Sequence, residues 1–201
     1  MQKTRVEAFS DAVIAIAMTI MVLELKPPAT PDLAALAKIG PTFLYYVLSF
    51  VNLGIYWNNH HHLIQAAKHV NGAVLWANMH LLFWLSLIPL GTEWMGADHL
   101  STIPTAAYGV VLLLCGVAYY ILCQTLVVAN GRDSVLARAL GQDRKGKLSV
   151  VLYAVGVPLA LVSPILSCAT YVAVAFMWLI PDRRFERALL AGHEMAGHDK
   201  E

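Results

Sequence analysis

Charge is scarce in this chain of 201 residues. Only 13% of the residues are Asp, Glu, Lys or Arg, about half the share of a typical soluble domain, and the net charge is +1. So few charges do not suit a soluble globular protein, and the lack of excess positive charge excludes a nucleic-acid partner. Cysteine is rare as well. Cys115, Cys123 and Cys168 lie inside apolar runs without a CxxC spacing, so no disulfide or metal-binding framework is predicted.

Apolar residues make up 58% of the chain and gather in runs long enough to cross a hydrocarbon layer about 30 Å thick. The sequence therefore predicts an all-α, polytopic membrane protein with six transmembrane helices, at residues 6–25, 41–61, 73–95, 105–129, 148–162 and 165–180. The second helix is expected to begin earlier, near Asp32. Pro158, Ser163 and Pro164 predict a tight hairpin between the last two helices. We expect residues 1–181 to form the transmembrane domain and 182–201 a short polar cytoplasmic tail.

The loop charges predict the orientation in the membrane. An even number of spans places both termini on one side, and cytoplasmic loops collect Lys and Arg. With the N-terminus inside, all but Lys26 and Lys38 of the 14 basic residues fall on the cytoplasmic side. We therefore expect a protein of the cell membrane, surrounded by lipid, with both termini in the cytoplasm.

The first predicted helix has two different faces. Successive residues of a helix are rotated by about 100° around its axis, and on this basis one face of the first helix carries mostly branched aliphatic side chains. These are Phe9, Ala12, Val13, Ile16, Thr19, Ile20 and Leu23. Ser10 and Asp11 point away from that face, and a carboxylate inside a membrane is a functional hypothesis because charge is costly there.

The second and third predicted helices offer partners at the same depth. The second ends with Trp57 and the histidines 60–62, and Asn78 lies about as far into the third helix as Asp11 lies into the first. We predict a network in which Ser10 and Asp11 meet Trp57, one of these histidines, and Asn78. Such a network would satisfy polar groups that lipid cannot hydrogen-bond, and the alternative to a functional role is that it only fixes the packing of the helices.

These residues resemble a known family. The run RVEAFSD at 5–11, the run WNNHHH at 57–62 and the segment 78–89 are similar to the transmembrane protein 175 potassium channels, bacterial branch. The resemblance covers roughly the first half of the chain; the second half is similar only in hydrophobicity and number of spans. Neither the family nor this sequence has a TVGYG filter loop.

The resemblance implies a potassium-selective channel: a homotetramer in which the first helix of each subunit lines a central pore. It places an apolar constriction on Ile16, five residues after the FSD aspartate, followed by Thr19, Ile20 and Leu23. It implies potassium ions as the transient occupants of the pore, with no cofactor and no bound metal. The structural network that it implies consists of Arg5, Phe9, Ser10, Asp11, Trp57, His61 and Asn78.

Two alternatives remain. A chain with eight histidines raises the alternative of a metalloenzyme. Only one histidine cluster exists, however. In the tail, His193 and His198 are one residue too far apart to match the HExxH motif. We therefore do not expect an enzyme. A proton-coupled secondary transporter, using Asp11 and the neighbouring histidines, is the stronger rival. Against it, the chain has no inverted halves and no second FSD-like segment.

Overall fold

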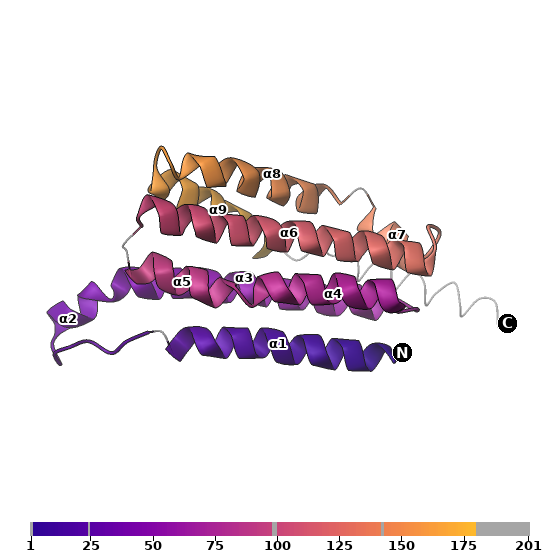
Figure 1. The fold of residues 1–201 in the computed structure, drawn as a ribbon, viewed down its shortest axis with the longest axis horizontal. Helices are drawn as coiled ribbons and strands as arrows, with labels where there is room; N and C mark the ends of the chain where they lie inside the picture. Colours follow the sequence, from indigo (N-terminus) through magenta and orange to yellow (C-terminus); the bar gives the residue numbers. More distant parts are fainter. Residues whose placement is uncertain (1, 24, 98–99, 142, 180–201) are drawn as a thin grey trace.

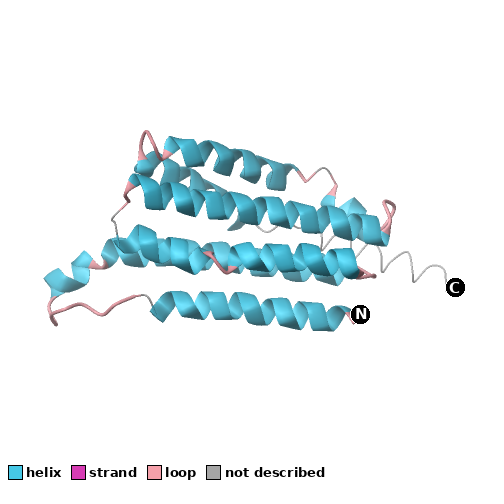
Figure 2. Ribbon diagram, in the orientation of Figure 1, coloured by secondary structure: helices cyan, strands magenta, loops and turns pink. Residues whose placement is uncertain are grey.

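A computed structural model describes residues 2–23, 25–97, 100–141 and 143–179. Within these ranges every regular element is a helix, as Figure 2 shows. The helices are α1 (Lys3–Leu23), α2 (Leu33–Lys38), α3 (Gly40–Ala66), α4 (Gly72–Leu85), α5 (Ile88–Ala97), α6 (Thr102–Asn130), α7 (Val135–Leu140), α8 (Arg144–Leu159) and α9 (Pro164–Leu179).

The long helices lie side by side along one axis of the molecule (Figure 1). They are α1, α3, the successive pair α4 and α5, α6, α8 and α9. In the part of the chain that the structure describes, three stretches are long and apolar enough to cross a membrane. They are Lys3–Leu23, Gly72–Ala97 and Thr102–Asn130, and α9 is apolar but shorter. The predicted all-helical membrane fold is confirmed. The predicted tail lies outside the described residues, as does the histidine pair His193 and His198.

The structure departs from the predicted helices at three places. The third span is split into α4 and α5 at residues 86–87, because Pro89 has no N–H to continue the helical ladder. The second span does not extend back to Asp32. That residue instead caps the separate helix α2, its Oδ1 accepting from the Ala35 N–H at 2.7 Å. The loop between the fourth and fifth spans contains α7, whose Leu136 is buried.

Small residues allow the outer helices to approach one another. Gly109 on α6 faces the buried ring of Tyr171 on α9, and a Cβ added there would overlap the tyrosine hydroxyl. That hydroxyl accepts from Ser167 Oγ at 2.8 Å and donates to the carbonyl of Thr105 at 3.3 Å, so the ring is held in place from two sides. Close packing here depends on the absence of a side chain at position 109.

We predict that Gly109→Ala lowers the free energy of unfolding by about 1–3 kcal/mol, because the added methyl group must displace the Tyr171 ring. The thermal midpoint of the detergent-solubilised protein measures this loss. Gly54→Ala in α3 is the matched control, since a Cβ there meets nothing within 4 Å. Equal midpoints for the two variants would contradict the packing described here.

Candidate pore helix and the polar network behind it

Helix α1 lies at the edge of the bundle, with one face packed and one face uncovered (Figure 1). The packed face meets α3, α4 and α5 and carries Val6, Ser10, Ile14, Ala17 and Met21, all buried. These positions recur every three or four residues, which is the spacing of one face of a helix. The bundle of one subunit therefore uses only half of α1.

The uncovered face of α1 carries large apolar side chains. Ile16 is 57% exposed and Leu23 is 77% exposed, and Phe9 and Ile20 are exposed beside them. Thr19 is also exposed, and its hydroxyl donates to the carbonyl of Ile16 at 2.9 Å. The predicted strip thus lies on the uncovered side, except that Val13 is half-buried against the core. These side chains have no covering partner within one described subunit.

A chain of buried hydrogen bonds lies directly behind that strip. Asn78 on α4 donates through Nδ2 to Ser10 Oγ at 2.9 Å, and Ser10 Oγ donates to the carbonyl of Val6 at 2.8 Å. His60 on α3 lies 2.8 Å from Asn78 Oδ1, which makes Nε2 the donor atom of the imidazole. The side chains of Ser10, His60 and Asn78 are almost fully buried. Three helices are joined by groups that lipid could not satisfy.

A second, more exposed contact joins α1 to α3 beside this chain. Trp57 donates through Nε1 to Asp11 Oδ1 at 3.0 Å. His61 stacks on the Trp57 ring with the centroids 6.1 Å apart, and its Nδ1 lies 2.9 Å from Glu7 Oε1. Asp11 and Glu7 are four residues apart, so they lie on the same side of α1. Their partners on α3, Trp57 and His61, are also four residues apart.

The structure adds a second histidine, His60, to the predicted network. The residue bonded to Asn78 is His60, whereas His61 turns outward to Glu7 and Gln65. Successive helical residues differ by about 100° in direction, and the sequence alone does not say which of three adjacent histidines faces inward. Glu7 was missed, although its position four residues before Asp11 was a signal. Among the described residues, the side chain of Arg5 makes no hydrogen bond or ion pair, and it is exposed.

The directions in which the helices run bring Ser10 and Asn78 to the same level along the bundle. Helices α1 and α4 both begin at the end where α3 finishes, so Ser10 and Asn78 lie a similar distance from their helix starts. Lys3 fixes this end by donating through Nζ to the carbonyls of Gln65 and Ala67, at 2.7 and 3.2 Å. A lysine at the C-terminus of a helix is favoured by the helix dipole.

A second polar cluster, absent from the sequence analysis, lies farther along the bundle. Thr92 on α5 lies 2.6 Å from Ser49 Oγ on α3, and Ser49 Oγ lies 2.8 Å from the hydroxyl of Tyr108 on α6. Isolated Ser and Thr residues within apolar runs were the available signal. No group of three His, Cys, Asp or Glu side chains in the described ranges is placed to hold a metal ion.

Comparison with known proteins gives the family. A protein named as a potassium channel, from Chryseobacterium sp. (strain P1-3), is 48% identical over 189 residues, covering 94% of this chain and 98% of that protein. The sequence profile described as endosomal/lysosomal potassium channel TMEM175 matches residues 5–89. The chain belongs to the TMEM175 family. The matched residues contain α3, α4 and all of α1 except its first two residues, and with them the bonds from Ser10 and Asp11 to α3 and α4.

Other TMEM175 proteins share parts of the chain. The human protein named as an endosomal/lysosomal proton channel is 33% identical over 105 residues, which are 46% of this chain and 21% of the human protein. The crystal structure of a lysosomal potassium-selective channel TMEM175 homolog from Chamaesiphon minutus superposes with a TM-score of 0.77. That match covers 90% of this chain and 97% of the other at 22% identity, so it confirms the TMEM175 fold.

We predict that Asn78→Leu destabilises the protein by about 1–3 kcal/mol, because Ser10 and His60 both lose a buried partner. Thermal unfolding in detergent measures the effect. Asn58→Leu is the matched control, since Asn58 is exposed on α3 and makes no hydrogen bond with the described residues. If Asn78→Leu were no less stable than Asn58→Leu, the network would not hold the three helices together.

Proposed function

We propose that this protein is a passive potassium channel in the cell membrane. Four copies surround a central pathway, and the uncovered face of α1 lines it. The observation that carries this proposal is the half-covered state of α1, a helix with one face packed on its own subunit and the other made of exposed Phe9, Ile16, Ile20 and Leu23. The relative that is 48% identical over almost the full length carries the name potassium channel, which supports the same function here.

The proposed assembly is a closed ring of identical subunits. One subunit supplies one α1 and no repeat of it, so a symmetric pathway requires several copies around an axis. Four copies are implied by the family resemblance. In this assembly both termini lie in the cytoplasm, residues 1–181 form the channel, and 182–201 form a cytoplasmic tail. The basic residues near the N-terminus, Lys3 and Arg5, agree with that orientation.

Within the pathway, Ile16 forms the first ring, followed by Thr19, Ile20 and Leu23 toward the outer side. An isoleucine side chain offers no ligand to a cation, so ions pass with most of their water, and a narrow apolar ring closes by dewetting. Potassium is preferred over sodium because its hydration shell is removed at lower cost. A filter of this kind gives moderate selectivity, in contrast to a ring of carbonyl ligands.

The network behind α1 determines how far that helix can turn. The bonds from Ser10 to Asn78 and from Asp11 to Trp57 attach α1 to two other helices, α4 and α3. A rotation of α1 large enough to turn Ile16 away from the axis would break both. The network therefore holds the apolar ring in place, and opening is a change in the spacing of the four α1 helices.

We predict that Ile16→Asn reduces the preference for potassium over sodium several-fold, because an amide in the ring keeps water at the constriction. Flux of each cation into proteoliposomes measures the preference. The matched control is Ile121→Asn on α6, an isoleucine that is exposed but distant from α1. An unchanged preference in Ile16→Asn would remove this residue from the conducting path.

The transporter alternative gives a different result at Asp11. Asparagine keeps an oxygen that can accept from Trp57 but cannot carry a proton, so Asp11→Asn separates the hydrogen-bonding role from a proton-relay role. We predict passive potassium flux in this variant, with no proton gradient applied. Flux that requires a proton gradient in the native protein and is lost in Asp11→Asn would instead establish a proton-coupled transporter.

A further inference from the structure

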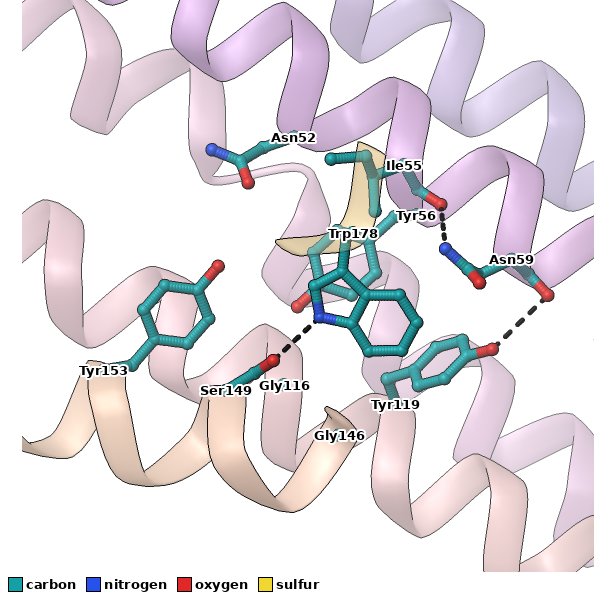
Figure 3. A pocket seen from close by; sticks show the side chains of 10 residues that line it. All are labelled: Asn52, Ile55, Tyr56, Asn59, Gly116, Tyr119, Gly146, Ser149, Tyr153 and Trp178. Atoms are coloured by element: carbon teal, nitrogen blue, oxygen red, sulfur yellow. Dashed lines mark hydrogen bonds between the residues drawn. The ribbon is translucent and has the colours of Figure 1, made fainter. Parts of the chain in front are cut away.

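The cavity drawn in Figure 3 lies between α3, α6, α8 and α9, and its walls offer few groups to a ligand. None of the described residues that line it is charged. Trp178 already donates through Nε1 to Ser149 Oγ at 2.7 Å, and Tyr119 donates to the carbonyl of Asn59 at 3.3 Å. This cavity is a gap in the packing of side chains.

A larger cavity, of about 310 Å³, has a charged lining and lies at the end of the bundle where α1 begins (Figure 1). It is bounded by the end of α3, the connection from α3 to α4, and the loop from α6 to α7. Lys68 lines it from the first connection, and Arg132 and Asp133 line it from the loop. These three residues are exposed, and none makes an ion pair with another described residue. Two cations and one carboxylate leave one positive charge in excess.

Asn130, at the end of α6, holds the two connections together. Its Oδ1 accepts from the backbone N–H groups of Lys68 and His69, at 2.7 and 2.8 Å. Its Nδ2 donates to the carbonyls of His69 at 3.0 Å and Leu126 at 2.9 Å. Because both the acceptor and the donor of this amide are bonded, the backbone at Lys68 is fixed to the end of α6. The relative position of the two connections is therefore set by the fold.

The position of the cavity along the bundle suits a lipid headgroup. Lys68 and Arg132 each follow the end of a long helix by two residues, because α3 ends at Ala66 and α6 at Asn130. Residues directly after a membrane span lie at the level of the headgroups. In the proposed orientation this end faces the cytoplasm, and basic pockets between helices on that side of a membrane bind phosphate-bearing headgroups.

We propose that this cavity binds an anionic phospholipid whose phosphodiester carries a neutral, hydroxylated group, as in phosphatidylglycerol. Lys68 and Arg132 contact the phosphate, and its single negative charge balances the excess positive charge of the lining. Asp133 accepts a hydrogen bond from a headgroup hydroxyl and repels a headgroup with a second negative charge. The site adjoins Ala67, whose carbonyl holds Lys3 at the start of α1. The choice of leaflet rests on the orientation given with the proposed function.

Native mass spectrometry of the full chain in detergent tests the proposal, because it counts the lipids that the protein retains. The probes are phosphatidylglycerol, phosphatidylcholine with the same acyl chains, and water-soluble glycerophosphoglycerol. We expect phosphatidylglycerol to be retained about five-fold more than phosphatidylcholine. Equal retention of the two lipids would overturn the proposal, and glycerophosphoglycerol retained as well as the lipid would overturn the assignment to a membrane ligand. The measurement involves no ion flux, so its failure is distinct from a failure of the proposed channel.

A double variant, Lys68→Gln with Arg132→Gln, locates the site. We expect it to lower the retention of phosphatidylglycerol about ten-fold, because two basic contacts to the phosphate are removed. The matched control is Arg138→Gln, an exposed arginine on α7 that does not line the cavity. An equal loss in the control would indicate diffuse attraction to the basic end of the bundle, and undiminished retention in the double variant would place the lipid elsewhere. Either result would overturn the proposal. Thermal midpoints measured without lipid show whether the variants are folded.

Asp133→Asn tests how the headgroup is selected. We expect the native protein to prefer phosphatidylglycerol to phosphatidic acid, whose phosphate monoester has more negative charge and no hydroxylated group attached. Asparagine removes the repulsion but keeps an oxygen that accepts from a hydroxyl, so the preference should fall about threefold or more. An unchanged preference would overturn the role of Asp133 in selecting the headgroup.

Discussion

The hydrogen-bond chain from His60 through Asn78 to Ser10 is the constraint on which the rest of the account depends. Its members lie on three helices that are distant in sequence, and each is buried where no solvent can replace a lost partner. In an apolar surrounding, satisfying these groups fixes the rotation of each helix about its own axis. Because Ser10 is held inward, Ile16 on the other side of α1 is held outward.

This arrangement assigns different tasks to the two parts of the chain. Helices α1, α3 and α4 carry the network, and all but the first two residues of α1 lie within the segment that matches the TMEM175 profile. Helices α6, α8 and α9 form the opposite side of the bundle, where Gly109 and Tyr171 pack closely. The second part supports α3, and α3 in turn supports the position of α1. A change in α9 can therefore reach α1 through α3.

The sequence predicted the helix class and most helix positions, because long apolar runs have few alternatives in a membrane. It predicted the partners Ser10, Asp11, Trp57 and Asn78, because equal depth from the helix starts limits which polar groups can meet. Whether His60 or His61 faces Asn78 depends on how α3 is rotated about its own axis, and a run of adjacent histidines does not reveal that rotation. The break before Pro89 was not predicted because it depends on local backbone geometry. Helix α7 was not predicted because it depends on packing beneath a polar loop.

The central claim is that four copies of α1 surround an axis with Ile16 turned toward it. A cryo-EM structure of the full-length protein in lipid nanodiscs with potassium tests this most directly. The account predicts four-fold symmetry, with the narrowest point of the axis formed by the Ile16 side chains and the bond between Asn78 and Ser10 intact behind them. An assembly in which the Ile16 side chains face lipid, or in which α1 lies away from the axis, would contradict it.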